Sequence, residues 1–508
     1  MSELQWAGAA RTQPLPSQLY SAAQHKELDR RVAQSLAISG FELMQRAGEV
    51  AFAVLRQHWP HARRLLLACG QGNNGGDALI VAGLALQQGM EVRLLLPQSV
   101  QAYASALTGE AAQAWAWLQQ QGVCQVVDVQ QLQASDYDLV VDGLLGVGFR
   151  GSLRTEWVEL VEAINQLRLP VLALDLPSGL EADSGRAPAG AVKATVTLTF
   201  LGLKPGLLSG QGADYCGQIL FHELGAPGQV YQSLQPVAER VDSSWIQAAL
   251  PKRQRTAHKG LHGHVVVVGG DLGMGGAALM AAQASLRAGA GRVTLLTRQE
   301  HVAPALMRQP EIMVQGVRNG LEAAPWLAQA DVILIGPGLG QQAWGQQQLQ
   351  QVLALPTAKV LDADALNLLA QQPAALGDSI LTPHPGEAAR LLGWSTAEVV
   401  QEPLAALAAL QQRYAGVTLL KGKGTWLAQQ PQRALMHAGN PGMAVAGMGD
   451  VLAGIIAGLY AQGLSAWQAA CVGAQVHAEA ADRVAARQGE RGLLATDLLA
   501  EIQNGVNP

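Results

Sequence analysis

A glycine-rich segment near the carboxyl end of the chain places a possible base beside a possible anion site. Asp450 follows Gly447 and Gly449, and an apolar run then continues as expected of a buried helix. Glycines at a helix start leave backbone N–H groups free for a ligand, and the helix dipole favours negative charge there. Asp450 is therefore a candidate base that takes a proton from a hydroxyl attacking a phosphoryl group. The alternative is that Asp450 only caps a core helix.

Three further motifs in this half of the chain carry charged or polar groups. Lys421–Thr425 reads KGKGT, and short loops of lysine and glycine suit phosphate oxygens. Asp362 and Asp364 follow a predicted strand, and they could cap a helix or hold Mg²⁺ through water. His384 lies in TPHPGE, a predicted strand-to-helix turn. Each motif lies at the carboxyl end of a strand or the amino end of a helix, so we expect all of them to meet in one crevice.

The first half offers a second group of polar residues. Asn73–Asp77 reads NNGGD and follows a short apolar strand, Leu65–Cys69. Its amide and carboxylate oxygens are hard donors that could hold a cation, although a tight turn with an Asp cap is the alternative. Asp142 and Asp175 end two more predicted strands, each before a glycine-rich loop. Three such loops at one sheet edge favour a ligand site.

Strand and helix patterns alternate throughout, which predicts parallel α/β structure in both halves. Residues 21–58 show helical periodicity broken near Ser39 and Gly40, so two helices are expected there. Between about Gly225 and Gly260 the pattern lapses into polar and proline-containing sequence. We therefore predict two domains, residues 1–228 and 229–508.

Composition excludes several classes of protein. The 508-residue chain has a formal net charge of −5 and no basic run, which argues against nucleic-acid binding. Its four cysteines lie far apart without CxxC spacing, which indicates a reducing compartment and neither disulfides nor zinc. The first residues lack a basic stretch followed by an apolar core, and no apolar run reaches about 18 residues, so we expect neither a signal peptide nor a membrane span. We expect a cytoplasmic protein with no membrane or nucleic-acid partner.

With these motifs assembled, the chain resembles the bifunctional NAD(P)H-hydrate repair enzymes, the YjeF family, from about Tyr20 to Gln503. The matching strings of the first half are CGQGNNGGDA, VDGLLGVGFRG, DLPSGLEADSG and KATVTLTFLGLKPGL. Those of the second half are GDLGMGGA, IGPGLG, LTPHPGEAARLL, KGKGT and AVAGMGDVLAGIIAGLYAQG. The family commonly has glycine where this chain has Ala78, and aspartate where it has Glu181. Neither change removes a predicted ligand.

The resemblance implies a fold and an activity for each domain. Residues 1–228 are expected to form a Rossmann-like three-layer parallel-sheet domain, and residues 229–508 a ribokinase-like α/β domain. In this family the damaged cofactor carries water at C6 of its nicotinamide ring, in R and S forms. The first domain is implied to interconvert the two epimers. The second is implied to dehydrate the S form at the expense of ADP, giving AMP and phosphate. A homo-oligomer is also expected.

The resemblance also implies roles for individual residues. Asp450 and Asp175 are the implied catalytic residues, with Lys204 assisting Asp175. Hydrate contacts in the first domain are implied for Asn73, Asn74, Gly75, Gly76, Asp77, Gly146, Val147, Gly148, Phe149, Arg150, Gly151, Ser152 and Asp175. Potassium ligands are implied for Asn74, Asp142 and Ser178. In the second domain, Mg²⁺ is implied, the hydrate contacts are Ala277, Gly338, His384 and Asp450, and the ADP contacts are Lys421, Gly422, Lys423, Gly424, Thr425 and Gly449.

Three rival functions compete with this hypothesis. The first is a ribokinase-class small-molecule kinase whose first half is a nucleotide-sensing module, because a GMGD segment suits either chemistry. The second is a non-catalytic binding module in the first half. The third, a Rossmann oxidoreductase, is disfavoured because the strand Val92–Leu96 runs into Pro97 and Gln98 and does not end on an acidic residue.

Overall fold

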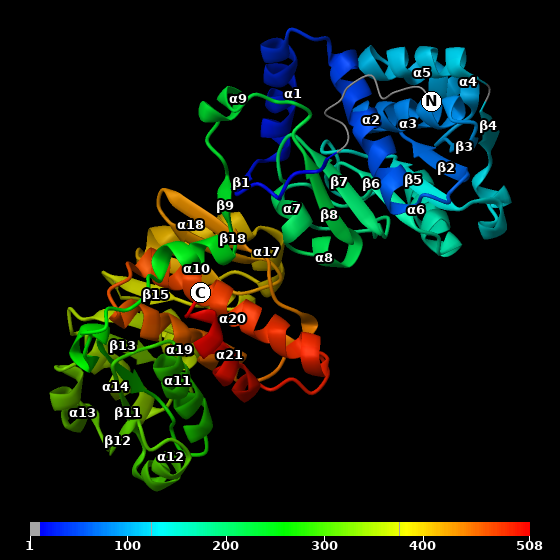
Figure 1. Cartoon of the computed structure of the whole chain (residues 1–508). Helices are drawn as coiled ribbons and strands as arrows, with labels where there is room; N and C mark the ends of the chain where they lie inside the picture. Colours follow the sequence, from blue (N-terminus) through cyan, green and yellow to red (C-terminus); the bar gives the residue numbers. More distant parts are fainter. Residues whose placement is uncertain (1–10, 123, 375) are drawn as a thin grey trace. The chain divides into compact units, whose positions relative to one another are not determined.

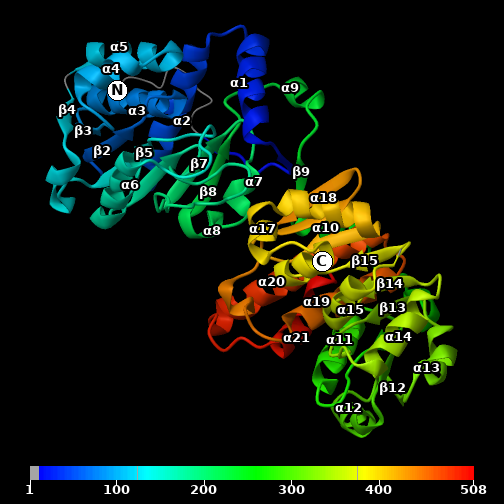
Figure 2. The same cartoon turned by 180° about the vertical axis from the view of Figure 1, so that it is seen from behind.

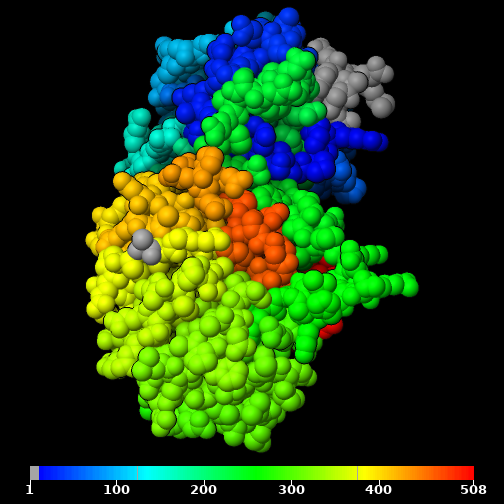
Figure 3. Space-filling view, turned by 90° about the vertical axis from the view of Figure 1, so that its left-hand side faces the viewer, coloured from blue at the N-terminus to red at the C-terminus, as the bar shows by residue number. Residues whose placement is uncertain are grey.

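The chain folds into two compact units, and the division between them along the sequence lies between Glu239 and Arg240. The computed structural model describes residues 11–122, 124–374 and 376–508. Figures 1 and 2 show the N-terminal unit in blue to green and the C-terminal unit in green to red. The predicted boundary after residue 228 lies earlier in the chain, where the short helix α9 (Gln229–Gln232) begins. Figure 3 shows one face of the molecule in space-filling form, with the same colours along the sequence.

The N-terminal unit is built on a seven-stranded sheet in which every pair of neighbours is parallel. The strand order is β4-β3-β2-β5-β6-β7-β8. The strands are β2 (Arg64–Cys69), β3 (Glu91–Leu95), β4 (Gln125–Val127), β5 (Leu139–Gly143), β6 (Val171–Leu174), β7 (Val196–Phe200) and β8 (Gln218–His222). A further short strand, β1 (Gln18–Leu19), pairs antiparallel with β9 (Ala238–Val241).

Helices cover both faces of this sheet, which makes a three-layer unit as predicted. Successive residues of β2 alternate between two apolar clusters, with Leu65 and Leu67 in one and Leu66 in the other. The helices are α1 (Ala22–Leu36), α2 (Gly40–His58), α3 (Asn73–Gln87), α4 (Val100–Ala106), α5 (Gly109–Gln121), α6 (Thr155–Leu167), α7 (Pro205–Leu208) and α8 (Gly212–Tyr215). The predicted break between α1 and α2 is confirmed, because Ser21 and Ser39 each form a capping box.

The C-terminal unit has a larger, mixed sheet. Its strands run in the order β18-β17-β16-β15-β14-β13-β10-β11-β12, parallel from β16 to β12 and antiparallel through β17 and β18. They are β10 (His264–Val268), β11 (Arg292–Thr297), β12 (Met313–Gly316), β13 (Val332–Ile335), β14 (Ala358–Leu361), β15 (Ser379–Leu381), β16 (Val417–Leu420), β17 (Thr425–Gln429) and β18 (Gln432–Met436).

Long apolar helices pack on this sheet and form its main core. Three of them, α11 (Gly275–Arg287), α19 (Met448–Ala461) and α20 (Ala466–Gln488), share one cluster with β10 and β13. The others are α10 (Ser243–Ala249), α12 (Val302–Arg308), α13 (Gly320–Leu327), α14 (Ala343–Leu353), α15 (Ala363–Gln371), α16 (Pro385–Leu392), α17 (Thr396–Gln401), α18 (Pro403–Tyr414) and α21 (Leu498–Gly505). The predicted α/β class is confirmed in both units.

Two helix starts differ from the expected positions. The NNGGD segment is not a loop, because α3 begins at Asn73 and includes it. Gly72, in an extended conformation, occupies the cap position, so the first turn of α3 presents the Asn and Gly residues. Asp450 is not a helix cap either, because Gly447 holds that position with φ 94°. Only glycine adopts this left-handed conformation without strain. Asp450 therefore lies inside the first turn of α19.

Within the described part of the chain, we find no helix that combines the length and apolarity needed to span a bilayer.

The close approach of α11 and α19 gives a test of the C-terminal core. A Cβ on Gly454 would lie 2.2 Å from the carbonyl oxygen of Ala281. We expect Gly454→Val to destabilise the chain by about 2–3 kcal/mol, because the backbone of α11 must move. This corresponds to a thermal midpoint lowered by on the order of 5–10 °C in calorimetry. Gly276→Ala, where an added Cβ has no neighbour within 4 Å, is the control and should not lower the midpoint. An unchanged midpoint for Gly454→Val would contradict this packing.

Candidate active sites

In the C-terminal unit, the carboxyl ends of neighbouring parallel strands bring the predicted motifs together. The loops after β10, β13, β14, β15 and β16 follow one another along the sheet edge. They carry, in that order, the GDLGMGG turn, the GPGLG turn, the Asp362–Asp364 segment, TPHPGE and KGKGT. The start of α19 lies at the same edge, because a Cβ on Gly449 would be 3.3 Å from Lys421 Nζ and 3.6 Å from Asp362 Oδ2. The structure therefore places the predicted motifs along one edge of the sheet.

A buried charge cluster lies beside the start of α19. Lys421 Nζ donates to Asp362 Oδ1 at 2.8 Å and lies 3.8 Å from Glu387 Oε2. Thr382 Oγ1 donates to the same Asp362 oxygen at 2.8 Å. Burial alone would lower the pKa of Lys421, but the carboxylates of Asp362 and Glu387 hold it above its ordinary value. The ammonium therefore stays charged beside the glycine segment.

This cluster sets the protonation of Asp450. Burial, and next the negative charge of Asp362, raise the pKa of Asp450 to about 7, while Lys421 acts in the opposite direction. A carboxyl group with a pKa near neutrality is suited to accept a proton at physiological pH. The buried His477 of α20 lies beside the backbone of Met448 in the first turn of α19.

The predicted hydrate contacts of this unit lie on neighbouring turns. A Cβ on Gly338 would be 3.2 Å from Ala277 Cβ, so these two positions touch. His384 caps α16, and its Nδ1 accepts a hydrogen bond from the Gly386 N–H at 3.0 Å. Burial, and next the charge of Lys421, lower the pKa of His384. The imidazole is thus neutral and carries its proton on Nε2, which lies 3.4 Å from Glu387 Oε1.

The two lysines of KGKGT point to different partners. Lys421 joins the Asp362 cluster, whereas Lys423 Nζ donates to the Gly439 carbonyl at 3.0 Å. Gly424 has φ 74°, which makes a turn that Thr425 Oγ1 closes by donating to the Gly422 carbonyl at 3.2 Å. In the described residues, only the first lysine contacts a carboxylate of the cluster beside Asp450.

In the N-terminal unit, the predicted potassium ligands lie together. Asp142 is fully buried, and its carboxylate accepts hydrogen bonds from Ser178 Oγ at 2.6 Å and the Ser178 N–H at 2.8 Å. Asn74 Nδ2 donates to the Leu145 carbonyl at 2.8 Å, and the Leu145 N–H donates to Ser178 Oγ at 2.8 Å. Asn74, Asp142 and Ser178 are therefore linked through the backbone of Leu145.

The donors of this group suit a monovalent cation. Asn74 Oδ1 is buried and has no hydrogen-bond partner among the described residues. Burial raises the pKa of Asp142 to about 6, although the hydrogen bonds from Ser178 act against it. A cation would satisfy the unpaired amide oxygen and favour the ionised carboxylate, so the residues fit the implied potassium ion.

The loop from Gly146 to Ser152 lies against this group at its start and is held at its end. A Cβ on Gly146 would be 3.2 Å from Asn74 Cβ. The Gly151 N–H donates to Glu181 Oε1 at 2.8 Å, and Arg150 pairs with Asp183 at 2.6 Å. The loop after β5 is thus tied to the loop after β6 by two charge-assisted contacts. Glu181, where the family commonly has aspartate, supplies one of them.

Asp175 forms the centre of a second polar group at the same sheet edge. Lys204, which is 1% exposed, forms an ion pair with Asp175 and donates to Thr199 Oγ1 at 2.8 Å. Thr199 Oγ1 in turn donates to Asp175 Oδ1 at 3.3 Å. Asp175 has φ 63°, a left-handed conformation that is costly for a residue with a side chain. Strain of this kind is concentrated at functional sites, which supports Asp175 as a reacting group.

Two more carboxyl groups lie within electrostatic reach of Asp175. Asp29 is exposed at the surface, but desolvation by the surrounding protein, and next the charge of Asp175, raise the pKa of Asp29 to about 7. The same two causes raise the pKa of Asp77 well above its ordinary value. One turn before Asp29 on α1, His25 lies beside Gly202, since its Cε1 would be 2.9 Å from a Cβ there. Helix α1 therefore brings Asp29 to the group that contains Asp175 and Lys204.

Sequence reasoning missed Asp29, Thr199 and His477. Asp29 looks like an ordinary solvent-facing residue of an amphipathic helix, and His477 lies in an alanine-rich helix. Thr199 is one of several β-branched residues in a strand. None of them belongs to a glycine-rich loop, so no local pattern marks them.

Known proteins match both units. Residues 265–504 match the family described as NAD(P)H-hydrate dehydratase, and residues 40–206 match the family described as YjeF-related protein N-terminus. The bifunctional NAD(P)H-hydrate repair enzyme Nnr of Coxiella burnetii is 45% identical over 96% of this chain and 99% of that protein. The enzyme of the same name from Escherichia coli is 44% identical over 97% of this chain and 95% of its own length.

Among solved structures, a ribokinase-like superfamily protein from Enterococcus faecalis covers 53% of this chain and 94% of its own, with a TM-score of 0.50 and 31% identity. This likeness agrees with the α/β fold of the C-terminal unit. The near full-length relatives contain both units in one chain. By its sequence along its whole length, the chain belongs to the bifunctional NAD(P)H-hydrate repair enzymes.

Proposed function

We propose that this chain repairs hydrated NADH and NADPH, with the N-terminal unit (residues 1–239) interconverting the R and S epimers and the C-terminal unit (residues 240–508) dehydrating the S form with ADP. The observation that carries the proposal is the Asp450 cluster. A base with a pKa of about 7 stands beside the Gly447–Gly449 segment and a charged lysine. This is the arrangement that phosphoryl transfer to a hydroxyl requires.

The dehydration follows from these groups. Asp450 takes the proton of the C6 hydroxyl as its oxygen attacks the terminal phosphorus of ADP, and the bond to the leaving AMP breaks. Backbone N–H groups at Gly447–Gly449 and the Lys421 ammonium stabilise the charge on the transferred group. The C6–O bond then breaks with loss of the C5 proton, which gives the reduced nicotinamide and phosphate. Ala277, Gly338 and His384 line the hydrate side, and Gly422–Thr425 with Gly449 the nucleotide side.

Mg²⁺ is the metal expected with the nucleotide. Asp362 Oδ2 receives no hydrogen bond from the described residues and faces the start of α19. Asp362, directly or through water, is therefore the residue that would hold the ion. The ion would neutralise charge on the phosphates of ADP.

In the N-terminal unit, Asp175 is the proposed acid–base group and Lys204 assists it. Asn73–Asp77 and Gly146–Ser152 are proposed to contact the hydrate. Asn74, Asp142 and Ser178 would hold potassium, whose charge draws the anionic substrate to this edge. A homo-oligomeric state and a cytoplasmic location stay predictions from the sequence.

The proposal is tested with a mixture of R and S NADPH hydrates and ADP, following the absorbance of the reduced nicotinamide. We expect the native chain to recover all of the hydrate and to need nucleotide. Asp450→Asn should lower recovery by about 10²–10⁴-fold, because the base is lost. With Asp175→Asn, recovery of the absorbance in short incubations should stop once the S form is used up.

Other outcomes of this assay separate the rival functions. No recovery by the native chain with ADP or ATP would refute the repair function and favour a ribokinase-class kinase. If recovery by the native chain ends when the S form is used up, the dehydratase activity would be supported and the epimerase activity refuted. Recovery by Asp450→Asn at the native rate would refute the proposed base.

The pKa of Asp450 predicts a pH dependence for dehydration. Because burial and Asp362 raise this pKa to about 7, the active carboxylate form is lost as pH falls through that value. We expect kcat/KM for the S hydrate to fall about tenfold per pH unit below about 7 and to level off above it. A flat profile between pH 5 and 8 would contradict this assignment.

The cation group predicts a response to potassium. Replacing KCl by choline chloride at equal ionic strength should slow epimerisation and lower the thermal midpoint, because the ion binds only the folded state. In Asn74→Ala, neither the rate of epimerisation nor the thermal midpoint should depend on potassium. Asn73→Ala, altered at the exposed neighbouring position, should keep the potassium-dependent midpoint. Equal midpoints of the native chain in the two salts would count against a potassium site.

A further inference from the structure

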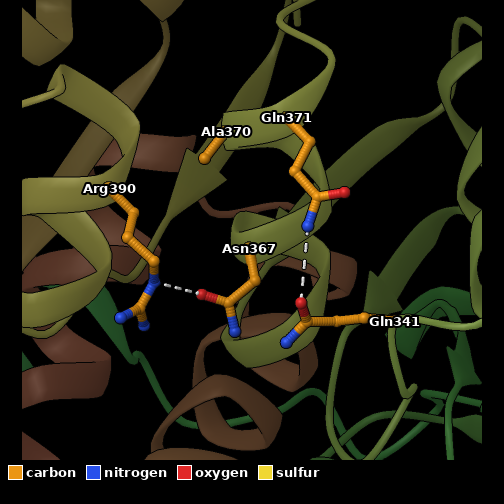
Figure 4. Close-up of a pocket in the computed structure, with 5 residues that line it drawn as sticks. All are labelled: Gln341, Asn367, Ala370, Gln371 and Arg390. Atoms are coloured by element: carbon orange, nitrogen blue, oxygen red, sulfur yellow. Dashed lines mark hydrogen bonds between the residues drawn. The ribbon is translucent and has the colours of Figure 1, made fainter.

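An open pocket of about 500 Å³ lies on the C-terminal unit, and none of the residues to which a catalytic or binding role was assigned above lines it. Its lining residues are Gln341, Asn367, Ala370, Gln371 and Arg390. Figure 4 shows two pairs of side chains that reach toward each other across it. Arg390 Nε donates to Asn367 Oδ1 at 2.7 Å, and Gln371 Nε2 donates to Gln341 Oε1 at 3.4 Å. Its volume is within the range of about 300–1,000 Å³ that small ligands occupy.

The pocket adjoins both turns that are proposed to hold the hydrate. At one rim, Arg390 Nη1 would be 3.9 Å from a Cβ on Gly386, and the Cε1 of His384 would be 2.9 Å from the same point. At the other rim, Gln341 continues the turn of Gly338. The Gly340 N–H of that turn donates to Asp364 Oδ2 at 3.0 Å, and Gln341 Nε2 donates to Asp364 Oδ1 at 3.1 Å. A molecule bound at His384 and Gly338 thus has this pocket beside it.

The groups in the pocket suit a nucleotide. Across residues 11–122, 124–374 and 376–508, no ion pair includes Arg390, and its exposed guanidinium makes one hydrogen bond, through Nε. Its Nη groups are therefore available to a phosphate, which arginine binds through two parallel hydrogen bonds. Gln341 and Gln371 present carboxamides, which can pair with the N6 and N7 edge of adenine. Asn367, Ala370 and Gln371 share one face of α15, about 6 Å long.

We propose that this pocket binds the ADP-ribose half of the hydrated dinucleotide, with Arg390 on its pyrophosphate and the two glutamines beside its adenine. The inference rests on the proposed function. The nicotinamide ring must lie at Asp450, so the rest of the dinucleotide has to extend away from that centre. Arg390 lies one turn of helix after Gly386 and about 9 Å along α16 from His384, so it would meet the pyrophosphate before the far adenine ribose. NADH and NADPH hydrates share this pyrophosphate.

The direction of phosphoryl transfer assigns the pocket to the hydrate and not to ADP. The attacking and leaving oxygens must be roughly in line, so the hydrate approaches from the side opposite the AMP moiety. ADP is proposed to lie at KGKGT, after β16. The Gly338–Gln341 turn follows β13, which is separated from β16 by β14 and β15. The pocket extends from that turn and lies on the hydrate side.

Arg390→Gln in the full chain tests the proposal by steady-state kinetics with purified S hydrates. We expect KM for NADH and NADPH hydrates to rise about tenfold or more, because a charged contact to phosphate is lost. The kcat and the KM for ADP should stay within about twofold, since a uniform binding contact is removed. Arg390→Lys should recover part of the affinity, because it keeps the charge without the planar fork.

Two further variants sharpen the result. Ala370→Phe fills the pocket without removing charge, and it should also raise KM for the hydrates and leave KM for ADP unchanged. Arg308→Gln removes an exposed arginine of α12 and serves as the matched control, with native constants expected.

The outcomes distinguish the pocket from the function on which it rests. Native KM for both hydrates in Arg390→Gln and Ala370→Phe, with an active native chain, would overturn the pocket and leave the repair function intact. A rise in KM for ADP alone would assign the pocket to the nucleotide and overturn the proposal. A rise for NADPH hydrate alone would overturn the pyrophosphate contact. A native chain without dehydration would overturn the repair function itself.

Discussion

A buried ion pair between a lysine and an aspartate underlies each of the two candidate sites. Lys421 is paired with Asp362 in the C-terminal unit, and Lys204 with Asp175 in the N-terminal unit. A buried ammonium is stable only with a nearby carboxylate, and the pair fixes both side chains in place. In the C-terminal unit the pair stands beside Asp450 and balances its charge. In the N-terminal unit the aspartate of the pair is itself the proposed acid–base group.

The scaffold places these pairs where ligands can reach them. In both units parallel strands end at one edge, and the polar residues follow the strand ends. Helices with very small contact residues pack closely together beside the sheet, as where α19 meets α11 at Gly454. The start of α19 can then present backbone N–H groups to a phosphate, because Gly447 and Gly449 leave the approach open. The close packing at Gly454 and the glycine segment at the helix start therefore belong to the same helix.

Much of the fold and part of each site could be predicted from the sequence. The α/β alternation, the break at Ser39 and the strands before Asp142 and Asp175 are local patterns, and the structure confirms them. The sequence predicted a loop through Asp77 with a helix after it, and this was wrong, because an extended Gly72 caps the helix and α3 begins at Asn73. Asp29 and Thr199 were missed because they are polar residues of ordinary elements, and only packing brings them to Asp175.

The sequence by itself determined the family, the two-unit organisation and the residue types available for chemistry, because these depend on short motifs and periodicity. Tertiary structure alone decided which charges meet. It gave Lys421 and Lys423 different partners and brought Asp362 close to Gly449. It also placed Arg390 at an open pocket. The reason is physical: a pKa or a binding contact depends on distances of a few ångströms between side chains that are far apart along the chain.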